Sequence, residues 1–107
     1  MNNEFALTES TFYILLSLLR PQHGYGIMQT TLQLSSGRVR LAPGTLYGAL
    51  SALCEKGWII QLPVTDGSRK KEYGLTERGV QVLTAEIERL RELVRNAEQM
   101  MEEIEHV

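Results

Sequence analysis

The chain contains little cysteine and no long apolar run. Cys54 is its only cysteine, so no internal disulfide can form, which is typical of a reducing compartment such as the cytoplasm. Its apolar runs are only a few residues long, as around Tyr13 to Leu16, far too short to cross a bilayer. No basic start followed by an apolar block and a small-residue cleavage site is present. We therefore expect neither a secretory signal nor a membrane partner.

The side-chain sets that enzymes need are also missing. The two histidines, His23 and His106, lie far apart in the sequence, and Cys54 has no partner at ligand spacing, so no metal site is expected. The hydroxyls of Thr45 and Ser51 have no base beside them, and no glycine-rich phosphate loop follows a strand. We therefore predict no catalytic residue and no cofactor, and expect a binding protein rather than an enzyme.

Charge is unevenly distributed in this chain of 107 residues with a net charge of −2. Residues 1–75 carry seven Lys/Arg and five Asp/Glu, a balance of +2, whereas residues 76–107 carry four and eight, a balance of −4. The small basic excess is concentrated at Arg69, Lys70 and Lys71, and more weakly at Arg38 and Arg40. Local clustering, and not net charge, would have to attract an anionic partner.

Two short helices are expected in the first third of the chain. Thr8 can cap the first, and Phe12 lies on its apolar face. The second starts near His23 or Gly24 and runs to about Leu34, before the turn signal at residues 35–37.

Residues 43–75 show a helix, a strand, a basic turn and a second strand. Pro43 suits the first helical position, and Gly57 can end the helix in a left-handed conformation. Residues 58–62 and 71–75 have the composition of two strands, with Asp66 and Gly67 marking the turn. A helix that can enter the major groove beside a cationic hairpin is the layout of a winged helix-turn-helix. The expected fold class is therefore mainly α with a two-stranded β wing (α+β).

A long helix after Thr76 is expected to join two copies of the chain. Set in heptads, its a and d positions are all apolar: Val80, Leu83, Ile87, Leu90, Val94, Ala97, Met101 and Ile104. About thirty residues make a rod of roughly 45 Å, longer than the other helices can cover. The repeat predicts a homodimer, with packing on its own domain as the alternative. Residues 1–75 would form the DNA-binding domain and residues 76–107 the dimerisation helix.

Candidate DNA contacts lie on three elements. The outward face of the third helix offers Thr45, Tyr47 and Ser51, none of which reads a base with two hydrogen bonds as Arg or Asn can. DNA shape would then carry much of the specificity. The wing residues Arg69, Lys70 and Lys71 would contact phosphates.

Tyr25 and His23 stand at the start of the second helix, where free amides attract phosphate oxygens. Tyr25 and Tyr47 could instead be core aromatics. Cys54 is read as a small buried residue in preference to a redox sensor, and Trp58 as packed on the domain in preference to a ligand pocket.

Taken in order, these motifs resemble the PadR family of bacterial transcriptional regulators. The strings HGYGI at 23–27, PGTLYGALSALCEKGWI at 43–59 and KKEYGLTERG at 70–79 carry the resemblance, which covers roughly residues 8 to 105. It implies a winged helix-turn-helix dimer of the smaller class, which binds dyad-symmetric operators in double-stranded DNA and represses transcription. The DNA-facing residues that it implies are Tyr25, Thr45, Tyr47, Arg69, Lys70 and Lys71. A small-molecule effector is left open.

The chain departs from the family pattern at two positions. Ala42 stands where the family often has Ser, and Gly48 where it often has Pro, and each change costs a helix on the order of 1 kcal/mol. The chain has no aromatic residue after Tyr73, so a pocket for flat aromatic compounds between dimer helices is not supported. The alternative function is a protein-interaction module that uses the winged fold and the coiled-coil helix.

Overall fold

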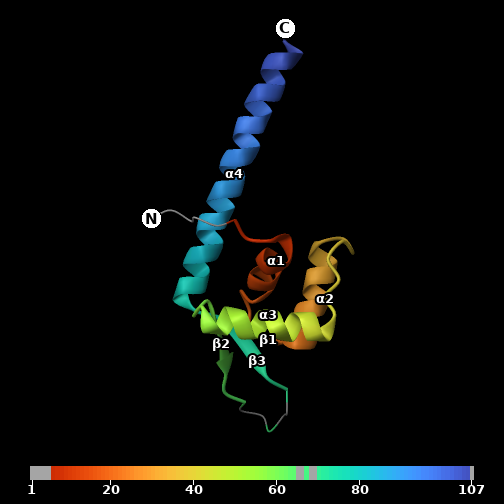
Figure 1. Cartoon of the computed structure of the whole chain (residues 1–107), viewed down its shortest axis with the longest axis vertical. Helices are drawn as coiled ribbons and strands as arrows, with labels where there is room; N and C mark the ends of the chain where they lie inside the picture. Colours follow the sequence, from red (N-terminus) through yellow and green to blue (C-terminus); the bar gives the residue numbers. More distant parts are fainter. Residues whose placement is uncertain (1–5, 65–66, 68–69, 107) are drawn as a thin grey trace.

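The computed structural model describes residues 6–64, 67 and 70–106 and confirms a winged helix-turn-helix with a long C-terminal helix (Figure 1). In chain order the elements are α1 (Glu9–Ser17), β1 (Gln22–His23), α2 (Gly24–Leu34), α3 (Pro43–Glu55), β2 (Ile59–Leu62), β3 (Glu72–Leu75) and α4 (Glu77–Glu105). The second half of α4 projects away from the other elements (Figure 1). Within these ranges no helix combines the length and the apolar character that a membrane span needs.

The helices begin where capping residues place them. Thr8 caps α1, His23 caps α2 and Thr76 caps α4, each by accepting a hydrogen bond from an amide of the first turn. α3 has no side-chain cap at Ala42 and begins instead with Pro43, whose fixed φ suits the first helical position.

The sheet has three strands, one more than the sequence predicts. β3 lies between β1 and β2, and both neighbours are antiparallel to it. β1 pairs Gln22 with Tyr73 and His23 with Glu72. Its two residues are too few to show the alternation that marks a strand. The extra pairing fixes the start of α2 beside the wing.

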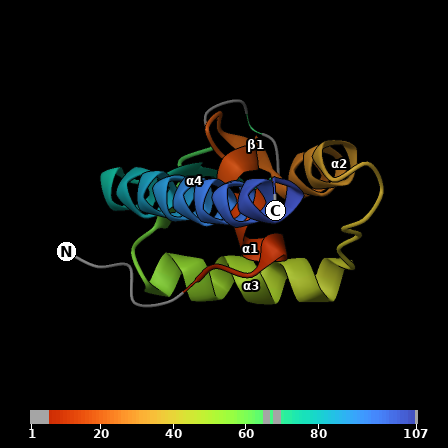
Figure 2. The same cartoon turned by 90° about the horizontal axis from the view of Figure 1, so that it is seen from above.

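One apolar core joins all the helices to the sheet. Seen from above, α3 lies along one side of the molecule, with α1 between it and α4 (Figure 2). The predicted inner stripe of α3, Leu46, Leu50 and Leu53, is buried against α1, α2 and β2. Leu83 belongs to the same core, with only 3 % of its surface exposed. The expected dimer contact at Leu83 is therefore replaced by a contact within its own domain, because the first turns of α4 pack on the core.

Backbone groups fix the start of α4 against the end of α3 and the start of β2. Thr76 donates its amide to the Trp58 carbonyl oxygen at 3.0 Å and its hydroxyl to the Gly57 carbonyl oxygen at 2.6 Å. A Cβ at Gly79 would overlap the Trp58 carbonyl oxygen. Only glycine therefore allows the first turn of α4 to lie this close to the strand.

A buried carboxylate holds the segment before α1 on α4. Glu86 is 1 % exposed and accepts a hydrogen bond from the Leu7 amide at 3.1 Å. Arg89 donates to both of its oxygens, at 2.7 and 2.8 Å. The Arg89 guanidinium, helped by the Leu7 amide, holds the pKa of Glu86 below its usual value, although burial opposes this shift.

We expect Gly79→Ala to lower the free energy of unfolding by about 1–3 kcal/mol, since the new methyl group meets a backbone oxygen that cannot move freely. Gly48→Ala is the matched control. A Cβ there would meet no atom within 4 Å, and alanine in a helix interior is favoured by roughly 0.5–1 kcal/mol. Urea denaturation of both variants measures the difference. Equal stability of the two variants would contradict the proposed contact.

We expect Glu86→Gln to lower the free energy of unfolding at pH 7 by about 1–3 kcal/mol, because a charge-assisted pair is lost. A carboxyl with a lowered folded-state pKa stabilises above its unfolded pKa of about 4.3 and loses this contribution as pH falls through the folded value. The gap between variant and wild type should therefore close below about pH 4. Glu88→Gln, at an exposed position of α4, should follow the wild type throughout. A gap that persists to pH 2 would show a steric cause instead.

Candidate nucleic-acid interface

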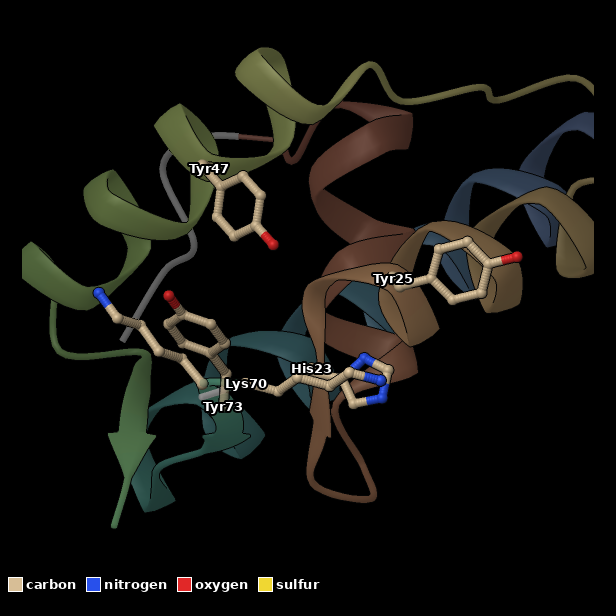
Figure 3. Close-up of a pocket in the computed structure, with 6 residues that line it drawn as sticks. His23, Tyr25, Tyr47, Lys70 and Tyr73 are labelled. Carbon is tan, nitrogen blue, oxygen red and sulfur yellow. The ribbon is translucent and has the colours of Figure 1, made fainter. Parts of the chain in front are cut away.

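The start of α2, the exposed side of α3 and the wing surround one hollow (Figure 3). Its volume is about 460 Å³, and its lining residues are His23, Tyr25, Tyr47, Lys70, Lys71 and Tyr73. Tyrosine rings and hydroxyls together with lysine ammonium groups can bind a phosphate backbone, through hydrogen bonds and through charge. Four of the predicted contact residues thus meet at a single site.

Tyr47 is both packed and accessible. It therefore combines the two roles considered from the sequence, a core aromatic and an outward-facing candidate contact. It extends from α3 toward the start of α2 (Figure 3), where its ring lies directly over Gly24. A Cβ at Gly24 would be 2.5 Å from Oη and 2.9 Å from Cζ of Tyr47. The side chain is nonetheless 48 % exposed. The missing side chain of Gly24 thus makes the space in which the ring is held at the hollow.

Tyr25 is an exposed residue and not a core aromatic. It is 63 % exposed, and its ring points away from Tyr47 (Figure 3). Gln29, one turn later on α2, donates a hydrogen bond to its hydroxyl at 3.0 Å. This bond holds the tyrosine along the outer surface of α2, where it extends the hollow toward solvent.

Of the two remaining lining residues, His23 was considered from the sequence only for its place at the start of the second helix, and Tyr73 was not considered at all. His23 Nδ1 caps α2 by accepting the Gly26 amide at 3.4 Å, which places the imidazole at the helix start. Tyr73 is 7 % exposed on β3, and burial raises the pKa of its hydroxyl. Strand alternation with Leu75 predicts that Tyr73 points inward, but only the fold shows that the inward side here ends in the hollow.

The wing lysines and the other α3 candidates lie in different places. Lys70 and Lys71 are exposed just before β3 and line the hollow. Thr45 and Ser51 are exposed on α3 but are not among its lining residues. Arg69, with the expected turn residue Asp66, lies outside the described residues.

Cys54 and Trp58 follow the structural interpretations favoured from the sequence. Cys54 is partly buried against the core, and burial raises the pKa of its thiol, as expected for a residue with a packing role. Trp58 also packs on the core, with Lys56 Nζ 5.0 Å from the centre of its ring.

A family model described as "Transcriptional regulator PadR-like family" matches residues 13–85. The chain belongs to this family. Its solved neighbours include a PadR family transcription regulator from Clostridium difficile, with 26 % identity, a TM-score of 0.65 and coverage of 84 % of this chain and 97 % of that one. A transcriptional regulator from Clostridium thermocellum has 22 % identity and a TM-score of 0.68, over 85 % and 92 % of the two chains.

A putative transcriptional regulator from Thermoplasma acidophilum is 25 % identical to the chain, with a TM-score of 0.66 over 87 % of this chain and 90 % of that one. No curated protein matches the chain in sequence. Membership confirms the PadR resemblance and the expectation that the chain is not an enzyme, because the family and these neighbours are transcriptional regulators. Family membership also supports the prediction that the chain is a DNA-binding transcriptional regulator.

We expect Gly24→Ala to weaken DNA binding by displacing the Tyr47 ring, at a cost of roughly 0.5–1.5 kcal/mol for an off-rotamer side chain. The effect should disappear when Tyr47 is already alanine, since the two residues then no longer meet. Fluorescence anisotropy on one DNA duplex measures the affinity of the wild type, the two single variants and the double variant, which together form a double-mutant cycle. Additive losses would contradict a role for Gly24 through Tyr47.

Proposed function

We propose that this chain is a homodimeric repressor that binds a dyad-symmetric operator in double-stranded DNA. The observation that carries the proposal is the convergence of α2, α3 and the wing on one hollow with lysines at its side. In this proposal residues 1–75 form the DNA-binding domain, residues 76–107 form the dimerisation helix, and the protein acts in the cytoplasm, where its DNA is.

On the DNA side, α3 enters the major groove and the wing follows the phosphates. Tyr47, Thr45 and Ser51 are the contacts of α3, since all three are exposed on it. Tyr25, Lys70 and Lys71 contact the backbone, together with Arg69. Hydroxyl groups distinguish bases less sharply than the paired donors of arginine, so the energy of deforming DNA contributes to the choice of operator.

On the dimer side, α4 offers an apolar face that its own domain leaves open. Every described residue from Leu90 onward is exposed. The large apolar side chains among them are 36–67 % exposed: Leu90, Leu93, Val94, Met100, Met101 and Ile104. A continuous apolar stripe of this kind marks a protein interface. Two copies joined here would hold two α3 helices for successive major grooves, about 34–36 Å apart.

Repression then follows from occupancy, because a dimer bound across a promoter excludes the polymerase. A small-molecule effector would act by changing the separation of the two α3 helices, since binding to both half-sites depends on it.

The test is an anisotropy titration on DNA from immediately upstream of the gene, against a scrambled duplex, at two salt concentrations. We expect at least about a thousandfold preference for the upstream DNA and a steep loss of affinity with salt. Equal, weak binding to both duplexes, with no fragment enriched from genomic DNA, would contradict the proposal. The protein-interaction module would then become the leading function.

Lys71→Ala should weaken binding to all duplexes alike and reduce the slope of log affinity against log salt by about 1, because one phosphate contact is lost. Arg78→Ala is the matched control. It removes one positive charge from an exposed position on α4 that does not line the hollow. An unchanged slope for Lys71→Ala, or the same change for Arg78→Ala, would exclude a phosphate contact at Lys71.

A further inference from the structure

The hollow between α2, α3 and the wing offers more than duplex DNA can use. Its volume of about 460 Å³ lies within the range of about 300–1,000 Å³ that is typical of small-molecule sites. The bases of a duplex are stacked inside it, so a duplex can offer phosphates to the hollow but no base faces. The tyrosine rings of the hollow therefore have no matching ring in duplex DNA.

Tyr73 carries a hydroxyl that the protein itself leaves without a hydrogen-bond partner. The residue is 7 % exposed and lines the hollow, and its hydroxyl is directed toward α3 (Figure 3). Within residues 6–64, 67 and 70–106 no group forms a hydrogen bond with this hydroxyl. Burial raises its pKa, so it stays a donor at neutral pH. It can therefore serve an acceptor that enters the hollow.

His23 and the wing lysines add further donors to the same space. His23 Nδ1 accepts the Gly26 amide at 3.4 Å, so the neutral ring carries its proton on Nε2, which remains a donor. Lys71, with Lys70 next to it, brings positive charge, and none of the described lining residues is acidic. This set suits a phosphate monoester, which has three acceptor oxygens and a charge of about −1.5 to −2 at pH 7. A carboxylate has only two oxygens and one charge.

Tyr47 supplies an aromatic surface beside these donors. Its ring is held over Gly24 and is still 48 % exposed. Nucleobases of every kind stack on tyrosine rings, because every base has a π-face. A free nucleotide can use both the phosphate donors and the aromatic surface, whereas a nucleotide within a duplex can use only the donors.

We propose that the hollow binds a free nucleoside monophosphate in competition with DNA. The phosphate accepts hydrogen bonds from Lys71, His23 Nε2 and the Tyr73 hydroxyl. The base stacks on Tyr47. The competition rests on the proposed DNA-binding function, in which DNA also uses Tyr47 and Lys71. A bound nucleotide then weakens DNA binding by mass action, and the regulator responds to the concentration of the nucleotide.

Calorimetric titration of the DNA-free protein with AMP tests the site. We expect one AMP per chain with a Kd of about 1 mM or lower. Inorganic phosphate and adenosine, which each offer only one half of the ligand, should bind at least about tenfold more weakly. AMP that binds no more tightly than either half would overturn the inference.

Tyr73→Phe removes only the hydroxyl. Because this hydroxyl has no partner in the described protein, the variant should melt at no lower temperature than the wild type. Its affinity for AMP should fall about tenfold or more, as for the loss of a hydrogen bond to a charged group. Tyr13→Phe is the matched control, since it removes a hydroxyl from α1 that does not line the hollow. Equal affinities of the two variants for AMP would overturn the proposed site.

Tyr47→Ala tests the place of the base. The variant should bind AMP little more tightly than inorganic phosphate, because the stacking surface is lost. A wild-type affinity for AMP in this variant would contradict stacking on Tyr47 and overturn the inference.

Competition on the upstream duplex, at constant ionic strength, tests the shared site. AMP at ten times its Kd should raise the apparent Kd for DNA about elevenfold in the wild type, and about twofold in a Tyr73→Phe variant that binds AMP tenfold more weakly. Adenosine at the same concentration should have little effect. AMP that binds the protein but leaves the DNA affinity unchanged would overturn the inference.

The outcomes separate the two proposals. Selective DNA binding without AMP binding would overturn the nucleotide site and leave the DNA-binding function intact. AMP binding that Tyr73→Phe weakens, in a protein without selective DNA binding, would overturn the proposed function and support the nucleotide site.

Discussion

The direction of α4 is the constraint on which the rest of the structure depends. It is set by contacts of main-chain groups at Thr76, Gly57 and Trp58, and by the absence of a side chain at Gly79. The same helix contacts β3 of the wing near its start and leaves an apolar face exposed from Leu90 onward. Any rotation at this junction would therefore change the distance between the hollow formed by α2, α3 and the wing and the free face of α4 within one chain.

Glu86 adds a second point of attachment two turns further along. Its carboxylate is costly to bury alone, but Leu7 and Arg89 supply three hydrogen bonds to it. Because Leu7 precedes α1, the Glu86 carboxylate joins the N-terminal segment of the domain to α4. An apolar residue at this position could pack as well, but it would leave the Leu7 amide without this acceptor.

The elements followed from the sequence wherever local chemistry decides them. Capping by Thr8 and Thr76, proline at the start of α3 and the positive φ of Gly57 are all local features. β1 was not predictable, because its two residues form a strand only through pairing with β3. A tertiary contact, and not a local pattern, creates it.

The candidate site also combines features that local sequence predicts with features that only tertiary contacts create. Sequence pattern identified Tyr25, Tyr47 and the wing lysines as candidates, since these residue types suit DNA and occupy exposed positions of a winged fold. It could not show that Tyr47 rests on Gly24, or that Tyr73 closes the hollow, because both depend on how α2, α3 and β3 meet. Likewise, the heptad pattern included Leu83 among the dimer contacts, although Leu83 is buried in the core of its own domain. Periodicity shows that a face is apolar but not which surface covers it.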